Sequence, residues 1–225
     1  PNWRENLKLI EKNNSLIDSY FITTHPDEIK SKIDKNKLNY LPIPVDENIE
    51  NLEIYKYKFK YKDLFFALSH GVNFGRLKKN KNDERETFIK NLIKRYPDLN
   101  YNILGISKEL PKWNYDYFNE LSKCKMALNL SRGKPIKQTS SNRIASLIGN
   151  GIYTFIDRKT QYNKIFNEDE VGTYDSIDEL GSKIENLLMK PKTIDNFSRN
   201  GKKKYFELYN SKLIAKNIIS STFNR

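Results

Sequence analysis

The stretch that most limits what this chain can fold into runs from Cys124 to Asp157. It begins with an apolar strand pattern at residues 126–130 and ends with another at 152–156. A helix pattern that starts at Thr139 lies between them. A strand, a loop, a helix and a second strand in this order form the repeating unit of α/β proteins. The stretch therefore predicts two buried strands joined by a helix.

The first turn of this central helix is rich in hydroxyl groups and carries an arginine. A helix N-terminus has unpaired N–H groups and the positive end of the helix dipole, so a diphosphate or a similar anion suits it. Serine and threonine are also preferred helix caps, which leaves open the alternative that Thr139 or Ser140 only caps the helix. The candidate anion-binding residues of this stretch are Arg132, Gly133, Ser140, Ser141, Asn142 and Arg143.

Strand and helix patterns alternate through the rest of the chain, which predicts an α/β fold with a Rossmann-like, doubly wound parallel sheet. In such sheets the ligand lies beyond the carboxyl ends of the strands. The turn at 149–151 should join the central helix to the next strand. At least one of Gly149 and Gly151 should be structural, either at positive φ or because a Cβ would meet a neighbour, and Gly149 is the one expected to end the helix. Further strands are expected at 64–69, 101–106 and 171–174, and helices at 26–33, 84–96, 115–123, 176–189, 194–209 and 211–222.

The loop after the first predicted strand of the sheet is a second candidate part of the anion site. It holds His70, Gly71 and Arg76 and is followed by several lysines. Glycine lets the backbone approach an anion closely, and arginine forms charge-assisted bonds to phosphate oxygens. A solvated loop would have the same composition, and His70 could equally satisfy a backbone carbonyl, so both alternatives stay open.

Charge and cysteine content narrow the functional classes. The net charge of +12 is compatible with nucleic acid, an anionic membrane face or phosphorylated small molecules. Lysine, asparagine and isoleucine are all abundant, as an AT-rich coding sequence would produce, so the charge is discounted. Cys124 is the only cysteine, which excludes an internal disulfide and favours a cytoplasmic location. The chain begins at Pro1 rather than Met, which suggests a partial chain.

Residues 64–209 resemble the C-terminal, donor-binding domain of GT-B glycosyltransferases, in particular the group 1 and spore-maturation glycosyltransferase-like proteins. The matching segments read FFALSHGVNFGR, KMALNLSRG, TSSNRIASLIGNGIYTFID and VGTYDSIDELGSKIENLL. The final segment, RNGKKKYFELYNSKLIAKNII, is similar to the closing helices of that family, and LPIPVD to its interdomain crossover. The fold that this implies is the C-terminal GT-B domain with a remnant of the N-terminal domain.

The resemblance also implies a division of the chain. Residues 1–48 would be the end of the N-terminal acceptor domain with the interdomain linker, and most of that domain would be absent. Residues 49–205 would form the nucleotide-sugar-binding domain, and 206–225 a C-terminal helix that packs back on the linker.

The function implied is glycosyl transfer, of a hexosyl or related group, from a nucleotide-diphosphate-sugar donor without a metal or other cofactor. His70 would act on a sugar hydroxyl, and the donor diphosphate would be bound by Gly71, Arg76, Arg132, Gly133, Ser140, Ser141, Asn142 and Arg143. Where many retaining relatives have a glutamate, this chain has Ser146, so the resemblance implies neither retention nor inversion.

The acceptor could be a glycan, a lipid or a protein, and peripheral membrane contact is left open. The alternative hypothesis is a non-catalytic basic module for nucleic acid or an anionic surface. Arginines concentrated at the strand ends would favour the enzyme, and a broad basic stripe with exposed aromatic residues would favour the binding module.

Overall fold

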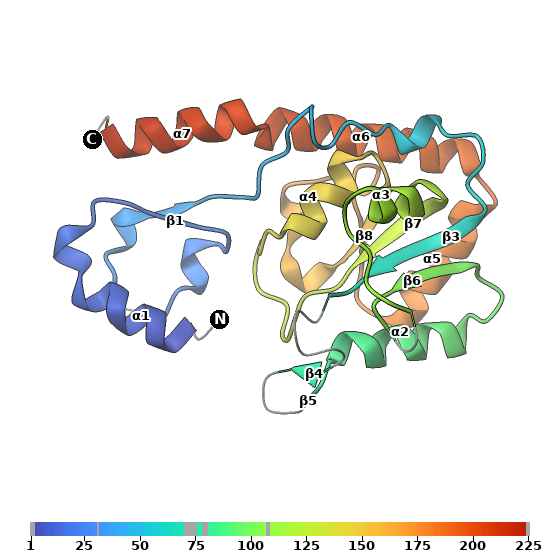
Figure 1. Ribbon diagram of the computed structural model, residues 1–225, viewed down its shortest axis with the longest axis horizontal. Coiled ribbons are helices and arrows are strands. Elements are labelled where there is room, and N and C mark those ends of the chain that lie inside the picture. Colours follow the sequence, from blue (N-terminus) through green and yellow to red (C-terminus); the bar gives the residue numbers. More distant parts are fainter. Residues whose placement is uncertain (1–2, 31, 70–75, 78–80, 107–108, 224–225) are drawn as a thin grey trace.

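The structure is a computed structural model that describes residues 3–30, 32–69, 76–77, 81–106 and 109–223. Its centre is a parallel sheet of five strands in the order β6-β3-β7-β8-β9 (Figure 1). The predicted α/β fold with a doubly wound parallel sheet is confirmed. The strands are β3 (Lys62–Ala67), β6 (Tyr101–Leu104), β7 (Cys124–Asn129), β8 (Tyr153–Asp157) and β9 (Gly172–Tyr174).

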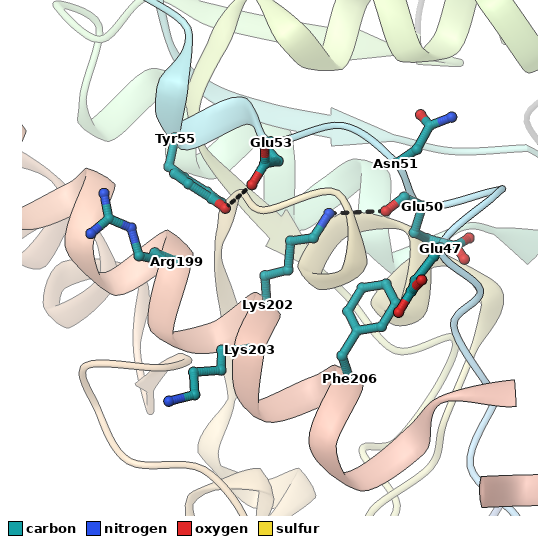
Figure 2. A pocket seen from close by; sticks show the side chains of 9 residues that line it. All are labelled: Glu47, Glu50, Asn51, Glu53, Tyr55, Arg199, Lys202, Lys203 and Phe206. Atoms are coloured by element: carbon teal, nitrogen blue, oxygen red, sulfur yellow. Dashed lines mark hydrogen bonds between the residues drawn. The ribbon is translucent and has the colours of Figure 1, made fainter. Parts of the chain in front are cut away.

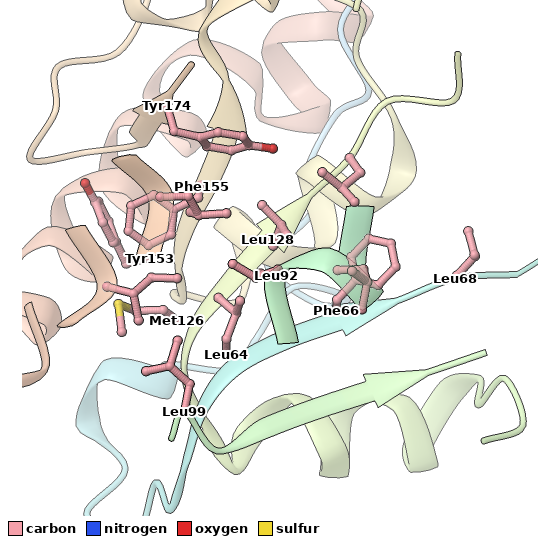
Figure 3. Close-up of a cluster of buried hydrophobic side chains, with 14 of the residues drawn as sticks. Leu64, Phe66, Leu68, Leu92, Leu99, Met126, Leu128, Tyr153, Phe155 and Tyr174 are labelled. Carbon is pink, nitrogen blue, oxygen red and sulfur yellow. The ribbon is translucent and has the colours of Figure 1, made fainter. Parts of the chain in front are cut away.

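The strand β3 lies inside the sheet, between β6 and β7, and it is apolar on both faces. Leu64 and Phe66 are buried in one core cluster, and Phe65, which points the opposite way, is buried in another. Leu64 pairs with Tyr101 of β6 on one side and with Met126 of β7 on the other. Figure 3 shows the first cluster, in which Leu64 and Phe66 lie near Met126 and Leu128.

Helices cover both faces of the sheet (Figure 1). Their positions agree with the sequence patterns to within a few residues. The helices are α2 (Glu84–Arg95), α3 (Asn114–Ser122), α4 (Asn142–Gly149), α5 (Ile177–Leu188), α6 (Pro191–Tyr209) and α7 (Ser211–Phe223).

Three details of the chain differ from the predictions. The helix expected at 26–33 is wrong, because only the 3-10 turn Pro26–Glu28 forms and Ile29 returns to extended backbone. Two apolar side chains, Ile29 and Ile33, are too few to stabilise a helical face. The helix α4 begins at Asn142 rather than Thr139, since Ser141 is its N-cap. A short hairpin of β4 (Arg76–Leu77) and β5 (Lys81–Asn82) was not expected.

The turn between α4 and β8 uses its two glycines for different reasons, and Gly149 is the last residue of the helix, as expected. Asn150 caps the helix with φ −86°, and Gly151 rather than Gly149 takes positive φ, at +73°. Gly149 is required for another reason: a Cβ there would lie 2.8 Å from Val45 Cγ1 and 2.7 Å from Glu50 Cγ. The backbone of α4 therefore packs directly against the segment that precedes the sheet.

The N-terminal segment forms a small unit beside the end of the sheet (Figure 1). It contains α1 (Trp3–Lys12) and two parallel strands, β1 (Tyr20–Ile22) and β2 (Leu38–Tyr40). An extended linker follows, in which Pro42 and Pro44 do not permit a helix. Within it, Val45 forms a parallel bridge with Asn210. The helix α7 runs back over this unit, where the Ser19 hydroxyl donates to the carbonyl of Ser221 (3.3 Å). The division into domains at residues 48 and 205 stays a prediction.

The turn that leads into α4 is attached to the N-terminal segment by backbone hydrogen bonds. The N–H of Ser140 donates to the carbonyl of Thr23 (2.7 Å), and the N–H of His25 donates to the carbonyl of Lys137 (3.3 Å). The hydroxyl of Tyr40 donates to the carbonyl of Gln138 (2.8 Å). The turn that leads into α4 is therefore held by residues about a hundred positions away in the sequence.

A lysine of α6 binds the segment at residues 50–52, which follows the linker, in a hollow of about 360 Å³ (Figure 2). The ammonium of Lys202 donates to the carbonyls of Glu50 (3.0 Å) and Leu52 (2.7 Å) and lies 5.2 Å from the centre of the Phe206 ring. Two backbone carbonyls that no β-ladder satisfies thus find one donor on the neighbouring helix.

Replacing Lys202 with Met is expected to destabilise the chain by about 1–3 kcal/mol, because both carbonyls lose their donor while the apolar stem is kept. The matched control is Lys203→Met, one residue along the same helix, where the side chain is 77% exposed. Denaturant melts of the two variants make the comparison. Equal midpoints for both would contradict the role given to Lys202.

Candidate active site

The strand order places a topological switch point between β3 and β7. The chain passes from β3 to β6 on one side and then returns to β7 on the other side of β3. The helices α2 and α4, which follow β3 and β7, pack on opposite faces of the sheet, and such a reversal opens the edge between the two strands to a ligand. The candidate site is the carboxyl end of these two strands.

Arg143 lies across this switch point. Its Nη1 donates to the carbonyl of Leu130, just after β7, at 3.1 Å, and its guanidinium carbon lies 5.4 Å from the ring centre of Phe66 in β3. Burial lowers the pKa of Arg143 to about 10, and the positive charge of Arg85 acts in the same direction. The group is still charged at neutral pH. Among the residues that the structure describes, no carboxylate forms an ion pair with it.

A second arginine, Arg85, lies near the same position and was missed by the sequence analysis. It is 8% exposed and forms two side-chain bonds to Asp83, which is 2% exposed. These run from Nε to Oδ1 (2.9 Å) and from Nη2 to Oδ2 (2.6 Å). Asp83 is also the N-cap of α2, since it accepts from the N–H of Arg85 (3.0 Å). Asp83 was recognisable as a helix cap, but nothing in the sequence indicated that the arginine two positions later is buried.

These side chains make the edge of the sheet electropositive. Two guanidinium groups, Arg143 and Arg85, are close enough for one to lower the pKa of the other, and Asp83 is bonded to Arg85. A guanidinium has five N–H donors, and the carbonyl of Leu130 accepts from one nitrogen of Arg143. The arrangement is suited to a ligand with several anionic oxygens.

The two serines before α4 use their hydroxyl groups within the protein. The Ser141 hydroxyl caps α4 by accepting from the N–H of Ile144 (3.3 Å). Ser140 is buried, and its hydroxyl accepts from the N–H of Ile43 in the linker (2.9 Å). Asn142, the first residue of the helix, is exposed. These placements favour a structural role for Ser140, whereas Asn142 stays free to contact a ligand.

Comparison with known proteins adds to this geometry. A family profile described as "Glycosyl transferase-like" matches residues 83–220, which is more than half of the chain. The chain belongs to this glycosyl transferase-like family. A search of curated proteins finds no match. The resemblance to GT-B glycosyltransferases noted in the sequence is confirmed.

Solved structures with a similar fold include three GT-B glycosyltransferases. HepE from Anabaena, solved in complex with UDP and glucose, is 11% identical with a TM-score of 0.64, and the match covers 96% of this chain and 66% of HepE. TarM is 12% identical with a TM-score of 0.63 and coverages of 96% and 45%. Sucrose-phosphate synthase from Thermosynechococcus elongatus is 11% identical with a TM-score of 0.58 and coverages of 92% and 59%. This glycosyl transferase-like chain thus spans about half to two thirds of their lengths.

The remaining predicted site residues of this glycosyl transferase-like chain fall in two groups. Arg132 and Gly133 are exposed in the loop after β7, at the same edge of the sheet as Arg143. His70 and Gly71 lie outside the described residues. Arg76 opens β4, and only its backbone is described. The roles of these residues stay predictions.

Within the described ranges, no group of three or more His, Cys, Asp or Glu side chains is placed to hold a metal ion. No helix in the described part of the chain has both the length and the apolar character that a membrane crossing needs.

Proposed function

We propose that this chain is the donor-binding part of a glycosyltransferase that uses a nucleoside-diphosphate sugar. The observation that supports it most is the position of Arg143, which is half-buried at the switch point. Within the described chain, no carboxylate accepts from the N–H groups of its guanidinium. A diphosphate there would receive hydrogen bonds from Arg143 and lie near the N-terminus of α4. Arg85, positioned by Asp83, would add positive charge.

The proposed chemistry requires charge stabilisation of a leaving diphosphate. As the glycosidic bond to the donor breaks, negative charge develops on the departing phosphate oxygen, and fixed arginines stabilise that charge most where water is excluded. In this proposal the arginines and the start of α4 do the work that a metal ion does in other transferases. His70 is the candidate for the acid–base step, and the cytoplasm is the proposed location.

The solved structure of HepE with UDP and glucose supports a nucleotide-sugar donor, since its fold covers 96% of this chain. The acceptor would be a glycan, a lipid or a protein held largely by the part of the enzyme before the linker. The alternative of a non-catalytic basic module is not favoured, because the family match and the arginines at the strand ends both point to the enzyme.

A panel of ligands tests the proposal by thermal shift. UDP, GDP and ADP are compared with UMP, uridine and inorganic phosphate. A ligand at about one hundred times its Kd should add about 2.7 kcal/mol of stability. We expect at least one nucleoside diphosphate to shift the midpoint more than its monophosphate does, and the nucleoside alone to have little effect. Equal shifts by nucleoside and diphosphate, or no shift by any nucleotide, would overturn the proposal.

A further inference from the structure

Residues 55–62 read YKYKFKYK, so aromatic and lysine residues alternate four times with no acidic residue between them. The segment joins a 3-10 turn, Ile54–Lys56, to the amino end of β3. It therefore lies at the amino edge of the sheet, whereas Arg143 contacts Leu130 after β7 and Phe66 near the carboxyl end of β3. The proposed donor site therefore makes no use of it.

Three of the four aromatic rings of this segment, Tyr57, Phe59 and Tyr61, are exposed, whereas Lys60 is largely covered. The ammonium of Lys60 forms an ion pair with Asp195 of α6, and its side chain is only 10% exposed. Neighbouring residues of an extended chain point to opposite sides. Phe59 and Tyr61 therefore face solvent and are 88% and 59% exposed. A largely covered lysine next to an exposed phenylalanine reverses the usual distribution of these side chains.

The exposed rings continue onto the neighbouring helix α3. A hollow of about 560 Å³ is lined by side chains of the linker and of α3, among them Ile49, Tyr57 and Tyr115. Ile49 is 62% exposed and Tyr115 is 80% exposed. We call this region the aromatic–lysine surface; it comprises Ile49, Tyr57, Lys58, Phe59, Tyr61 and Tyr115. Contiguous exposed apolar groups of this kind mark interaction sites.

The charge of this surface is positive where the rings are. Lys58 is exposed and has no ion pair within the described chain. The carboxylates nearest in sequence to residues 57–61 are already paired, Glu53 with Lys56 and Asp63 with Lys125. Near Ile49, Glu50 is buried and Glu47 is exposed. On α3, Glu120 forms ion pairs with both Lys112 and Lys123, so these three side chains together carry one net positive charge. Asp116 is the other carboxylate of that helix. A partner for this surface should be anionic and should accept apolar side chains.

We propose that the aromatic–lysine surface docks on an anionic lipid bilayer. Aromatic rings are enriched at the headgroup level of membranes, and lysines beside them are attracted to anionic lipids. A single-stranded nucleic acid would also stack on rings, but Ile49 gains nothing from stacking and the cations of the segment are all lysines. Docking at this edge leaves the carboxyl edge with Arg143 open.

The test is co-sedimentation of the 225-residue chain with vesicles. Phosphatidylcholine vesicles are compared with vesicles of phosphatidylcholine and phosphatidylglycerol, at low and high salt. The parent should bind the anionic vesicles more strongly, and less so at high salt. Phe59→Ser should weaken that binding by about tenfold or more. Lys58→Glu should weaken it by at least about fivefold, the factor for the loss of one lysine charge near the surface.

Matched controls separate docking from folding. Phe223→Ser makes the same change at a phenylalanine that is 76% exposed at the end of α7, and Lys164→Glu reverses the charge of an exposed lysine elsewhere. Neither control should alter vesicle binding, and all four variants should keep the parent melting midpoint and nucleotide affinity. Equal binding to neutral and anionic vesicles, or equal losses in variants and controls, would overturn the proposal. So would binding of a single-stranded oligonucleotide, in preference to vesicles, that Phe59→Ser abolishes.

Discussion

Replacing Arg143 with Ala is expected to weaken nucleoside-diphosphate binding by about tenfold to 150-fold, which corresponds to the loss of about 1.5–3 kcal/mol for hydrogen bonds to a charged group. The side chain already spans the ends of β3 and β7, so little conformational freedom is lost when a ligand binds. The affinity for the diphosphate should fall more than the affinity for the monophosphate, because the diphosphate presents more oxygen atoms to the same guanidinium.

Isothermal titration calorimetry with the best ligand of the nucleotide panel measures this effect. Arg143→Lys should restore only part of the affinity, since an ammonium cannot form two parallel bonds to a phosphate. The control is Arg95→Ala, which removes a guanidinium paired with Asp178 on the surface. Unchanged nucleotide affinity in Arg143→Ala, with a parent-like melting curve, would remove Arg143 from the donor site.

The second large effect is expected at Asp83. Replacing it with Ala should destabilise the fold by about 3–5 kcal/mol, the cost of leaving one partner of a buried ion pair alone. Arg85 would then lie beside Arg143 without its carboxylate, and α2 would lose its N-cap as well. Asp83→Asn keeps the cap but not the charge, so its loss should be smaller.

Two comparisons make the Asp83 result specific. Ser176→Ala removes the N-cap of α5, where the hydroxyl accepts from the N–H of Glu179, and should cost only about 1 kcal/mol. Inorganic phosphate should recover part of the stability of Asp83→Ala, because an anion that binds the folded form replaces the missing carboxylate. Phosphate should not do so for Ser176→Ala. A loss in Asp83→Ala no larger than that in Ser176→Ala would show that the ion pair contributes nothing.

The repeating architecture could be predicted from the sequence because it depends on local patterns. Continuous apolar runs such as Leu64 to Leu68 indicated strands buried on both faces, and the order of elements indicated a parallel sheet. In a parallel sheet the ligand is expected at the carboxyl edge, and this expectation made Arg143 a candidate ligand-binding residue. These steps need no knowledge of which distant side chains meet.

What the sequence could not indicate depends on such distant contacts. Ser140 stands in a hydroxyl-rich helix start that suits an anion, yet its hydroxyl is bonded to the linker almost a hundred residues earlier. Arg85 stands among charged residues at the start of a helix, so the sequence does not single it out. Only the folded structure places it near Arg143. Gly149 was expected to end the helix, but the sequence could not indicate that Val45 and Glu50 approach it closely or that Gly151 takes the positive φ.

The attachment of the N-terminal segment to the turn before α4 has a thermodynamic consequence. A ligand on Arg143 and any molecule that binds residues 20–27 act on the two sides of one turn, through the hydrogen bonds of Ser140 to Thr23 and of His25 to Lys137. If one ligand changes the rigidity of that turn, linkage requires each to alter the affinity of the other by the same factor. In that case, occupancy of the proposed donor position would change binding on the far side of the turn without any large movement of the sheet.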